Sequence, residues 1–204
     1  MKKIILIDTE NVCNESYIGV TELDSSYHLI LFVSEYSLKF NINTFIKMLS
    51  SNANIKSIKV KRKYDSKLKN LMDFFIVDYL YEQIYKGNIF DEYYIVSKDS
   101  DYDSWIYLFK HKFNLSINRG KNIYEAIYSR HVNKTLSSKI SKENFYSTSI
   151  KKDSLRNSLM KPSNRFLFDL ISDKKDFKFK DLDEKQYVLS YKNNYFDILP
   201  EGFK

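Results

Sequence analysis

The chain has few of the residues that interrupt or crosslink a polypeptide: its 204 residues include 4 glycines, 2 prolines and 1 cysteine. So little glycine and proline excludes collagen-like and linker-like chains, and it excludes glycine-rich phosphate-binding loops. The single cysteine, Cys13, excludes an internal disulfide framework and a zinc site built from cysteines. It also favours a reducing, cytoplasmic location.

Long apolar runs are missing too. The apolar run Ile4–Ile7 follows two lysines but stops after four residues at Asp8. A signal peptide needs an apolar core of about 7–15 residues, so this run is too short. No stretch approaches the roughly 18 apolar residues of a membrane-spanning helix. We therefore expect a cytoplasmic protein without a membrane partner.

The net charge is +7, from 33 basic and 26 acidic residues, which favours a polyanionic partner such as nucleic acid. A second explanation stays open, because a general bias toward Lys, Asn, Ile, Tyr and Phe can raise the lysine content without any ligand. The apolar fraction of 43% is enough for a packed core, and the length suits one domain with a small appendage.

Short apolar strands alternate with segments of helical spacing up to about residue 130. This alternation predicts an α/β fold with a mostly parallel central sheet, in which binding sites form at the carboxyl ends of the strands. Asn43 is the expected cap of the first helix. The predicted strands are Ile4–Ile7, Tyr27–Val33, Ile55–Val60, Tyr93–Val96 and Leu115–Ile117, and the predicted helices are Asn43–Leu49, Lys67–Lys86, Trp105–Lys112 and Ile123–Tyr128.

The composition changes after the predicted sheet. Residues 135–162 are rich in Ser, Lys and Asn, which is typical of a linker. Residues 163–204 regain aromatic residues and predict one helix and a few short strands. We expect a first domain over residues 1–134 and a small C-terminal α+β extension, which offers a surface for a homo-oligomer or a regulatory protein.

Three carboxylates occupy positions that an ordinary hydrophobic core would fill with apolar or uncharged residues. Asp8 follows the first strand, and Asp99 follows the strand Tyr93–Val96, so both are expected at one edge of a parallel sheet. On a helical wheel, Asp73 falls between Leu80 and Ile84 on the face that packs against the sheet. A buried carboxylate there needs a partner, a proton or a metal ion.

Each carboxylate also has an ordinary explanation. Asp8 would serve as a helix cap, the DxDxD run at residues 99–103 as a solvated loop, and Asp73 as the partner of Lys69 one turn earlier. The joint placement favours a metal site. Carboxylate oxygens without His or Cys select Mg²⁺ or Mn²⁺, and two such ions about 3.5–4 Å apart catalyse phosphodiester hydrolysis.

Three segments together resemble the PIN-like nuclease superfamily, in particular its NYN-type domains: IILIDTEN at residues 4–11, LMDFFIVDYL at 71–80 and YYIVSKDSDYDSWI at 93–106. The resemblance covers residues 1 to about 130. It implies a Rossmann-like, three-layer domain and a metal-dependent endoribonuclease that uses Mg²⁺ or Mn²⁺.

The resemblance also implies roles for single residues. Asn11 would orient water or the phosphate, and Ser97 would hydrogen-bond a metal-bound carboxylate. The final acid is either Asp103, which we prefer, or Asp101. The implied metal ligands are Asp8, Asp73, Asp99 and Asp103, with Asp101 as the alternative.

Basic residues next to these motifs are candidates for holding RNA phosphates. Tyr102 or Trp105 could stack on an unpaired base, although Trp105 also suits a core position. The candidate phosphate-binding residues are Lys59, Lys61, Arg62, Lys63, Lys98, Arg119 and Lys121.

Two other functions compete with an endoribonuclease. The first is a non-catalytic or partner-activated nucleic-acid-binding module with the same fold, because sequence cannot show that the acids converge. The second is a Toprim-like phosphotransfer domain, which also joins an acid at a strand end to a DxD pair, here Asp99 and Asp101. A Toprim domain normally begins with Glu and does not require Asp73.

Overall fold

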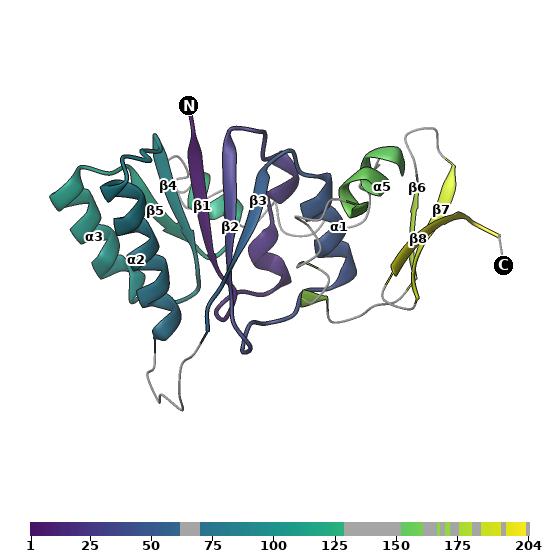
Figure 1. Cartoon of the computed structure of the whole chain (residues 1–204), viewed down its shortest axis with the longest axis horizontal. Helices are drawn as coiled ribbons and strands as arrows, with labels where there is room; N and C mark the ends of the chain where they lie inside the picture. The colour runs from purple at the N-terminus through teal and green to yellow at the C-terminus, as the bar shows by residue number, and fades with distance from the viewer. Residues whose placement is uncertain are drawn as a thin grey trace, which may run out of the picture. The chain divides into compact units, whose positions relative to one another are not determined.

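The computed structural model describes residues 1–61, 70–128, 152–160, 176–180, 185–192 and 195–202, together with Leu167, Leu170 and Ile171. The chain divides into two compact units. The first comprises Met1–Leu38 and Asn52–Ser129, and the second comprises Lys39–Ser51 and Arg130–Lys204. Figure 1 shows the elements of both units.

The first unit is built on a five-stranded sheet in the order β3-β2-β1-β4-β5, and every neighbouring pair is parallel. The central strand β1 carries the uninterrupted apolar run Ile4–Ile7, which is fully buried, as expected for a strand covered on both faces. The strands are β1 (Lys3–Asp8), β2 (Tyr27–Val33), β3 (Asn54–Lys59), β4 (Glu92–Val96) and β5 (Ile117–Gly120).

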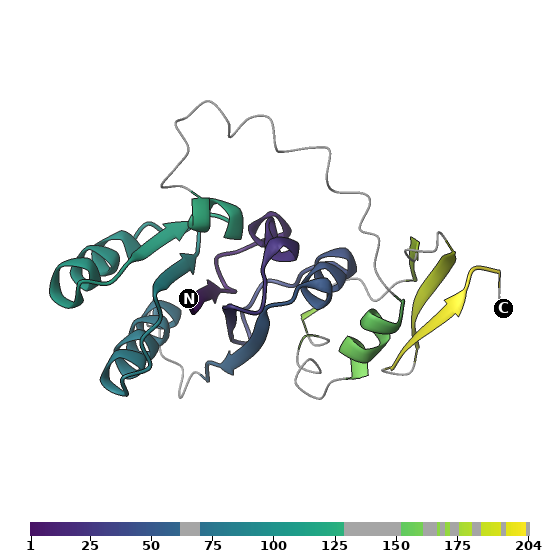
Figure 2. The same cartoon turned by 90° about the horizontal axis from the view of Figure 1, so that it is seen from above.

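Helices cover both faces of this sheet. Helices α2 (Leu71–Tyr85) and α3 (Tyr102–Phe113) lie on one face. The short 3-10 helices η1 (Asn14–Tyr17) and η2 (Val20–Glu22) and helix α4 (Ile123–Tyr128) lie on the other, as Figure 2 shows. The predicted three-layer α/β fold with a parallel central sheet is confirmed.

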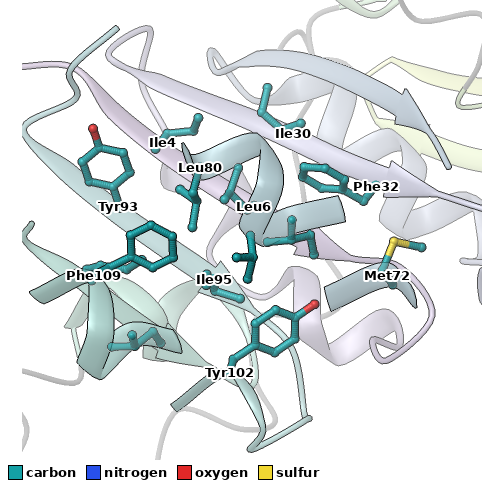
Figure 3. Close-up of a cluster of buried hydrophobic side chains, with 14 of the residues drawn as sticks. Ile4, Leu6, Ile30, Phe32, Met72, Leu80, Tyr93, Ile95, Tyr102 and Phe109 are labelled. Atoms are coloured by element: carbon teal, nitrogen blue, oxygen red, sulfur yellow. The ribbon is translucent and has the colours of Figure 1, made fainter. Parts of the chain in front are cut away.

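The core between the sheet and helices α2 and α3 fixes the positions of these two helices. Leu6 and Ile95 of the sheet pack with Leu80 of α2 and Phe109 of α3, and all four side chains are fully buried (Figure 3). Burying a side chain of this size contributes about 1.5–3 kcal/mol. The helix ends that carry acidic residues are therefore held firmly against the sheet.

Helix α2 has the face pattern that its sequence predicts. Asp78 and Glu82 are exposed, whereas Leu80 and Asp73 are buried. The helix begins at Leu71, directly after Asn70, whose φ of 68° is left-handed. The first residues of the predicted helix, 67–69, lie outside the described residues, and so does Lys69 as a partner for Asp73.

Three predicted elements have a cap or boundary that was wrong by two residues or more. The first helix, α1 (Ile42–Ser50), is capped by Asn41 rather than Asn43, because the Asn41 side chain accepts a 2.8 Å hydrogen bond from the backbone N–H of Thr44. Helix α3 begins at Tyr102, three residues before Trp105. Strand β5 pairs from Ile117 onward, since its register follows β4. Local spacing does not reveal such tertiary pairings.

The second unit contains α1, helix α5 (Lys152–Met160) and an antiparallel sheet. The sheet consists of β6 (Phe177–Lys180), β7 (Gln186–Lys192) and β8 (Tyr195–Pro200). Helix α5 lies inside the range 135–162 that we expected to be a linker. The segment before α1 also joins this unit, because Phe40 forms a β-bridge with Ile171.

In the part of the chain that the structure describes, no helix is both long and apolar enough to cross a membrane.

Candidate active site

The carboxylate of Asp8 is the most firmly held acid at the carboxyl edge of the sheet. Asp8 ends β1 and is fully buried. Its Oδ2 accepts hydrogen bonds from Asn11 Nδ2 at 2.8 Å, Tyr102 Oη at 3.1 Å and Ser97 Oγ at 3.2 Å. Its Oδ1 accepts one from the backbone N–H of Glu10 at 3.1 Å. Neighbours from three segments of the chain therefore fix the orientation of this carboxylate.

The two buried acids are electrostatically costly in the absence of a cation. Burial raises the pKa of Asp8, and its four hydrogen bonds oppose that rise. The pKa of Asp73 is raised to about 6, chiefly by burial and also by the charges of Asp8, Asp99 and Asp101, while the Tyr102 hydroxyl acts in the opposite sense. Asp73 is only 4% exposed, in the first turn of α2. Like charges thus gather where water cannot solvate them well.

The acidic loop, residues 97–101 between β4 and α3, is hydrogen-bonded within itself and to the residue that precedes α2. The backbone N–H of Asp99 donates to Ser97 Oγ at 3.1 Å, and Asp99 Oδ1 accepts from the backbone N–H of Asp101 at 2.9 Å. Asn70, directly before α2, donates from Nδ2 to Asp101 Oδ2 at 3.2 Å. This contact brings the acidic loop to the helix end that carries Asp73.

Asp103 has a different partner. It forms a two-pronged ion pair with Arg119, with Nε–Oδ1 and Nη2–Oδ2 distances of 2.8 Å each. This pairing lowers the pKa of Asp103. Arg119 also donates from Nη1 to the Ser97 carbonyl at 3.2 Å. The charge of Asp101 is among those that raise the pKa of Asp73.

The candidate phosphate-binding residues are dispersed along the edge. Lys59 ends β3, Lys61 follows it, and Lys121 follows β5, and all three are exposed. Lys98 is exposed in the acidic loop, with its Nζ 2.8 Å from Cys13 Sγ. Of the remaining three, Arg62 and Lys63 lie outside the described residues, and Arg119 is engaged with Asp103.

Tyr102 has a different role in the structure from the one that its position in the sequence suggested. We expected it as a possible base-stacking residue, but its ring is fully buried and its hydroxyl contacts Asp8 and Asp73. Trp105 is partly buried and packs against the core. The only signal in the sequence was the position of Tyr102 directly after the acidic loop, where an inward-facing hydroxyl can reach the strand ends.

The donor set suits a hard divalent cation, because carboxylate oxygens are the ligands that Mg²⁺ and Mn²⁺ prefer. The carboxyl groups are close enough to influence one another's ionisation, and a cation would relieve that repulsion. Across the described residues, however, no three Asp, Glu, His or Cys side chains already surround a common point that a metal ion could occupy. Metal binding at this edge therefore requires side-chain rotations.

The fold and site define a three-layer α/β domain with acids gathered at the carboxyl edge of its parallel sheet. A family model described as PIN domain, PIN7, matches residues 2–115, which is more than half of the chain. The chain belongs to the PIN domain family, whose members are generally nucleases that depend on divalent metal ions. No curated protein and no solved structure matches the chain.

Proposed function

We propose that this protein is an endoribonuclease of the NYN type that uses Mg²⁺ or Mn²⁺. The observation that carries the proposal is the pair of buried carboxylates, Asp8 and Asp73, which face the acidic loop from two different elements. An uncompensated cluster of this kind lowers stability, and a bound cation offsets that cost. The family match supports the same chemistry.

In this proposal Asp8, Asp73, Asp99 and Asp101 hold the metal. The bound ion would polarise the scissile phosphate and lower the pKa of a water nucleophile. Asn11 orients Asp8 through its amide nitrogen, and Ser97 does so through its hydroxyl.

Asp103 has a supporting role. Through Arg119, which also donates to the Ser97 carbonyl, it anchors the chain segment between β4 and α3.

The arrangement of positive charge favours RNA that crosses the sheet edge. In the strand order, the strands that bear Asp8 and the acidic loop lie between β3 and β5. Lys59 and Lys61 lie at the β3 end of this edge, and Lys121 lies at the β5 end. Phosphates on either side of the scissile bond would therefore meet a lysine. A single strand can follow such an edge because its backbone bends freely.

A cleavage assay tests the proposed function directly. The purified full chain is incubated with end-labelled single-stranded RNA, or with DNA of the same sequence, in Mn²⁺, Mg²⁺ or EDTA. We expect internal cleavage of RNA that needs the metal and stops in EDTA. Cleavage that persists in EDTA, or equal cleavage of DNA, would contradict the assignment as a metal-dependent endoribonuclease.

Asp101 and Asp103 are expected to respond differently to amide substitution. Asp101→Asn should lower the single-turnover rate constant for RNA cleavage by at least about a hundredfold, because it removes a metal ligand. Asp103→Asn should cost tenfold or less, because its partly exposed ion pair with Arg119 is worth only about 0–1 kcal/mol. A larger loss in Asp103→Asn than in Asp101→Asn would reverse the ligand assignment.

A non-catalytic nucleic-acid-binding module is the second candidate. One observation favours it: in the described parts of the chain, the acids do not converge on a ready-made metal position. Such a module would bind the RNA in EDTA and would not cleave it in either metal. Cleavage that appears only after a protein partner is added would indicate a nuclease that needs activation.

A further inference from the structure

Tyr102 stands between two buried acids that come from different elements. It is the first residue of α3, whereas Asp8 ends β1 and Asp73 lies in the first turn of α2. The hydroxyl of Tyr102 donates to Asp8 Oδ2 at 3.1 Å, and the same hydroxyl and the carboxyl group of Asp73 shift each other's pKa. This single oxygen therefore connects the three elements that bring the acids together.

Packing fixes the position of that hydroxyl. The ring of Tyr102 is fully buried in the same cluster as Met72, Ile106 and Phe109. Figure 3 shows the ring among these core side chains, with its hydroxyl directed away from Phe109 and toward the side of Met72. Met72 immediately precedes Asp73 in α2. The core thus holds the phenol in one orientation, and this orientation serves the acids.

The hydrogen bonds distinguish the two oxygens of Asp8. Oδ2 accepts from three donors, namely Asn11, Ser97 and Tyr102, whereas Oδ1 accepts from the backbone N–H of Glu10. A carboxylate oxygen has two lone pairs, so Oδ2 is fully committed and Oδ1 has capacity left. A cation bound by Asp8 would therefore be bound through Oδ1.

The two acids are not held equally. The Tyr102 hydroxyl has one hydrogen, and it donates this hydrogen to Asp8, which Asn11 and Ser97 also hold. The hydroxyl therefore holds Asp73 less firmly than Asp8, and its interaction with Asp73 is the easier one to exchange for a metal ion.

We propose that Tyr102 is a positioning residue that fixes Asp8 so that Oδ1 faces the metal and that keeps Asp73 within reach as the second ligand. The inference rests on the proposed metal-dependent function. It adds a residue that touches neither the metal nor the RNA and acts through two carboxylates.

Tyr102→Phe tests the inference, because it keeps the ring in the core and removes only the oxygen. Mn²⁺ binding is measured on the full chain without RNA, by the loss of the free-ion electron paramagnetic resonance signal. Removing a group that orients a metal ligand typically weakens binding 10–100-fold, so we expect a Kd that is higher by about that factor. The matched control is Tyr107→Phe on the same helix, where the side chain is 66% exposed and no change is expected.

The outcomes separate this inference from the proposed function. Equal Mn²⁺ binding by Tyr102→Phe and the wild type would overturn the role of Tyr102 even if the wild type cleaves RNA. Weaker binding by Tyr102→Phe, with no cleavage by the wild type, would support the inference and contradict a nuclease that is active on its own. A wild type that binds no Mn²⁺ would overturn both.

A second variant covers the case in which Tyr102→Phe does not fold. Ser97→Ala removes another donor to Asp8 Oδ2, at a residue that lies outside the core cluster. We expect it to weaken Mn²⁺ binding in the same direction, while the affinity for RNA in EDTA stays within twofold of the wild type. Unchanged Mn²⁺ affinity would show that the donors to Oδ2 do not orient Asp8 for the metal, and the inference would fail.

Discussion

Replacing Asp8 by Asn is expected to reduce metal-dependent RNA cleavage at least about a thousandfold, because the variant loses a central ligand of the ion that activates the nucleophile. The substitution also disturbs the site locally. Both carboxylate oxygens of Asp8 accept hydrogen bonds, and an amide has only one accepting oxygen. Its NH₂ group must therefore face either the Glu10 N–H or the donors on the other side.

The same variant separates catalysis from binding. RNA affinity in EDTA should remain within a fewfold of the wild type, because the lysines along the sheet edge do not contact Asp8. Asp78→Asn is the matched control, since it makes the same charge change on the exposed side of α2 and should leave cleavage unchanged. If Asp8→Asn still cleaves at a rate close to that of the wild type, the activity arises from another site or from a contaminant.

Replacing Asp73 by Asn is expected to stabilise the metal-free protein at pH 8. The pKa of Asp73 is raised to about 6 from an ordinary value of 3.8, so the folded state holds this proton more tightly than the unfolded state. The stability that the proton provides is fully present below pH 3.8 and is lost as the pH rises through 6. At about 1.4 kcal/mol per pKa unit, the charged carboxylate costs the fold about 1–3 kcal/mol at pH 8.

Thermal denaturation in EDTA measures this cost. At pH 8 the melting temperature of Asp73→Asn should exceed that of the wild type by about 2–10 °C, and the difference should shrink as the pH falls toward 4. Added Mn²⁺ should raise the melting temperature of the wild type and have little effect on the variant. A variant that is less stable than the wild type at pH 8 would contradict this prediction. It would mean that another group in the protein already compensates the negative charge of Asp73.

The stability cost of Asp73 and the expected loss of activity in Asp8→Asn have the same physical origin, which is the burial of acidic side chains at the sheet edge. Burial opposes the ionised forms of both acids, nearby negative charges also oppose that of Asp73, and a bound cation or a proton would relieve the cost. A protein selected for stability alone would not keep this arrangement.

Much of the fold could be predicted because its signals are local. The bounds of Tyr27–Val33 and Ile123–Tyr128 match the structure residue for residue. The first is an almost continuous apolar run, as in a buried strand, and the second has apolar residues at helical spacing. The inward position of Asp73 followed from the 100° step of a helix. The expectation of a parallel sheet put Asp8 and Asp99 at one edge, because each of them follows a predicted strand.

The partner of each side chain could not be predicted in the same way. Arg119 is a plausible phosphate ligand in sequence, yet it is bound to Asp103, sixteen residues away. Tyr102 is a plausible stacking residue in sequence, yet it is buried against Asp8, ninety-four residues away. Such pairings depend on how α3 packs on the sheet, and no periodicity in the chain encodes that distance.

The sequence by itself determined the type of each element, the parallel sheet and the set of acids at its carboxyl edge, because spacing and side-chain chemistry act over a few residues. Only the tertiary structure decided which oxygen of Asp8 is committed to hydrogen bonds, that Asp101 acts on Asp73, and that Asp103 pairs with Arg119. Only the tertiary structure also joined the segment before α1 to the second unit. The physical reason is that hydrogen bonds and burial depend on distances between segments, and packing sets those distances.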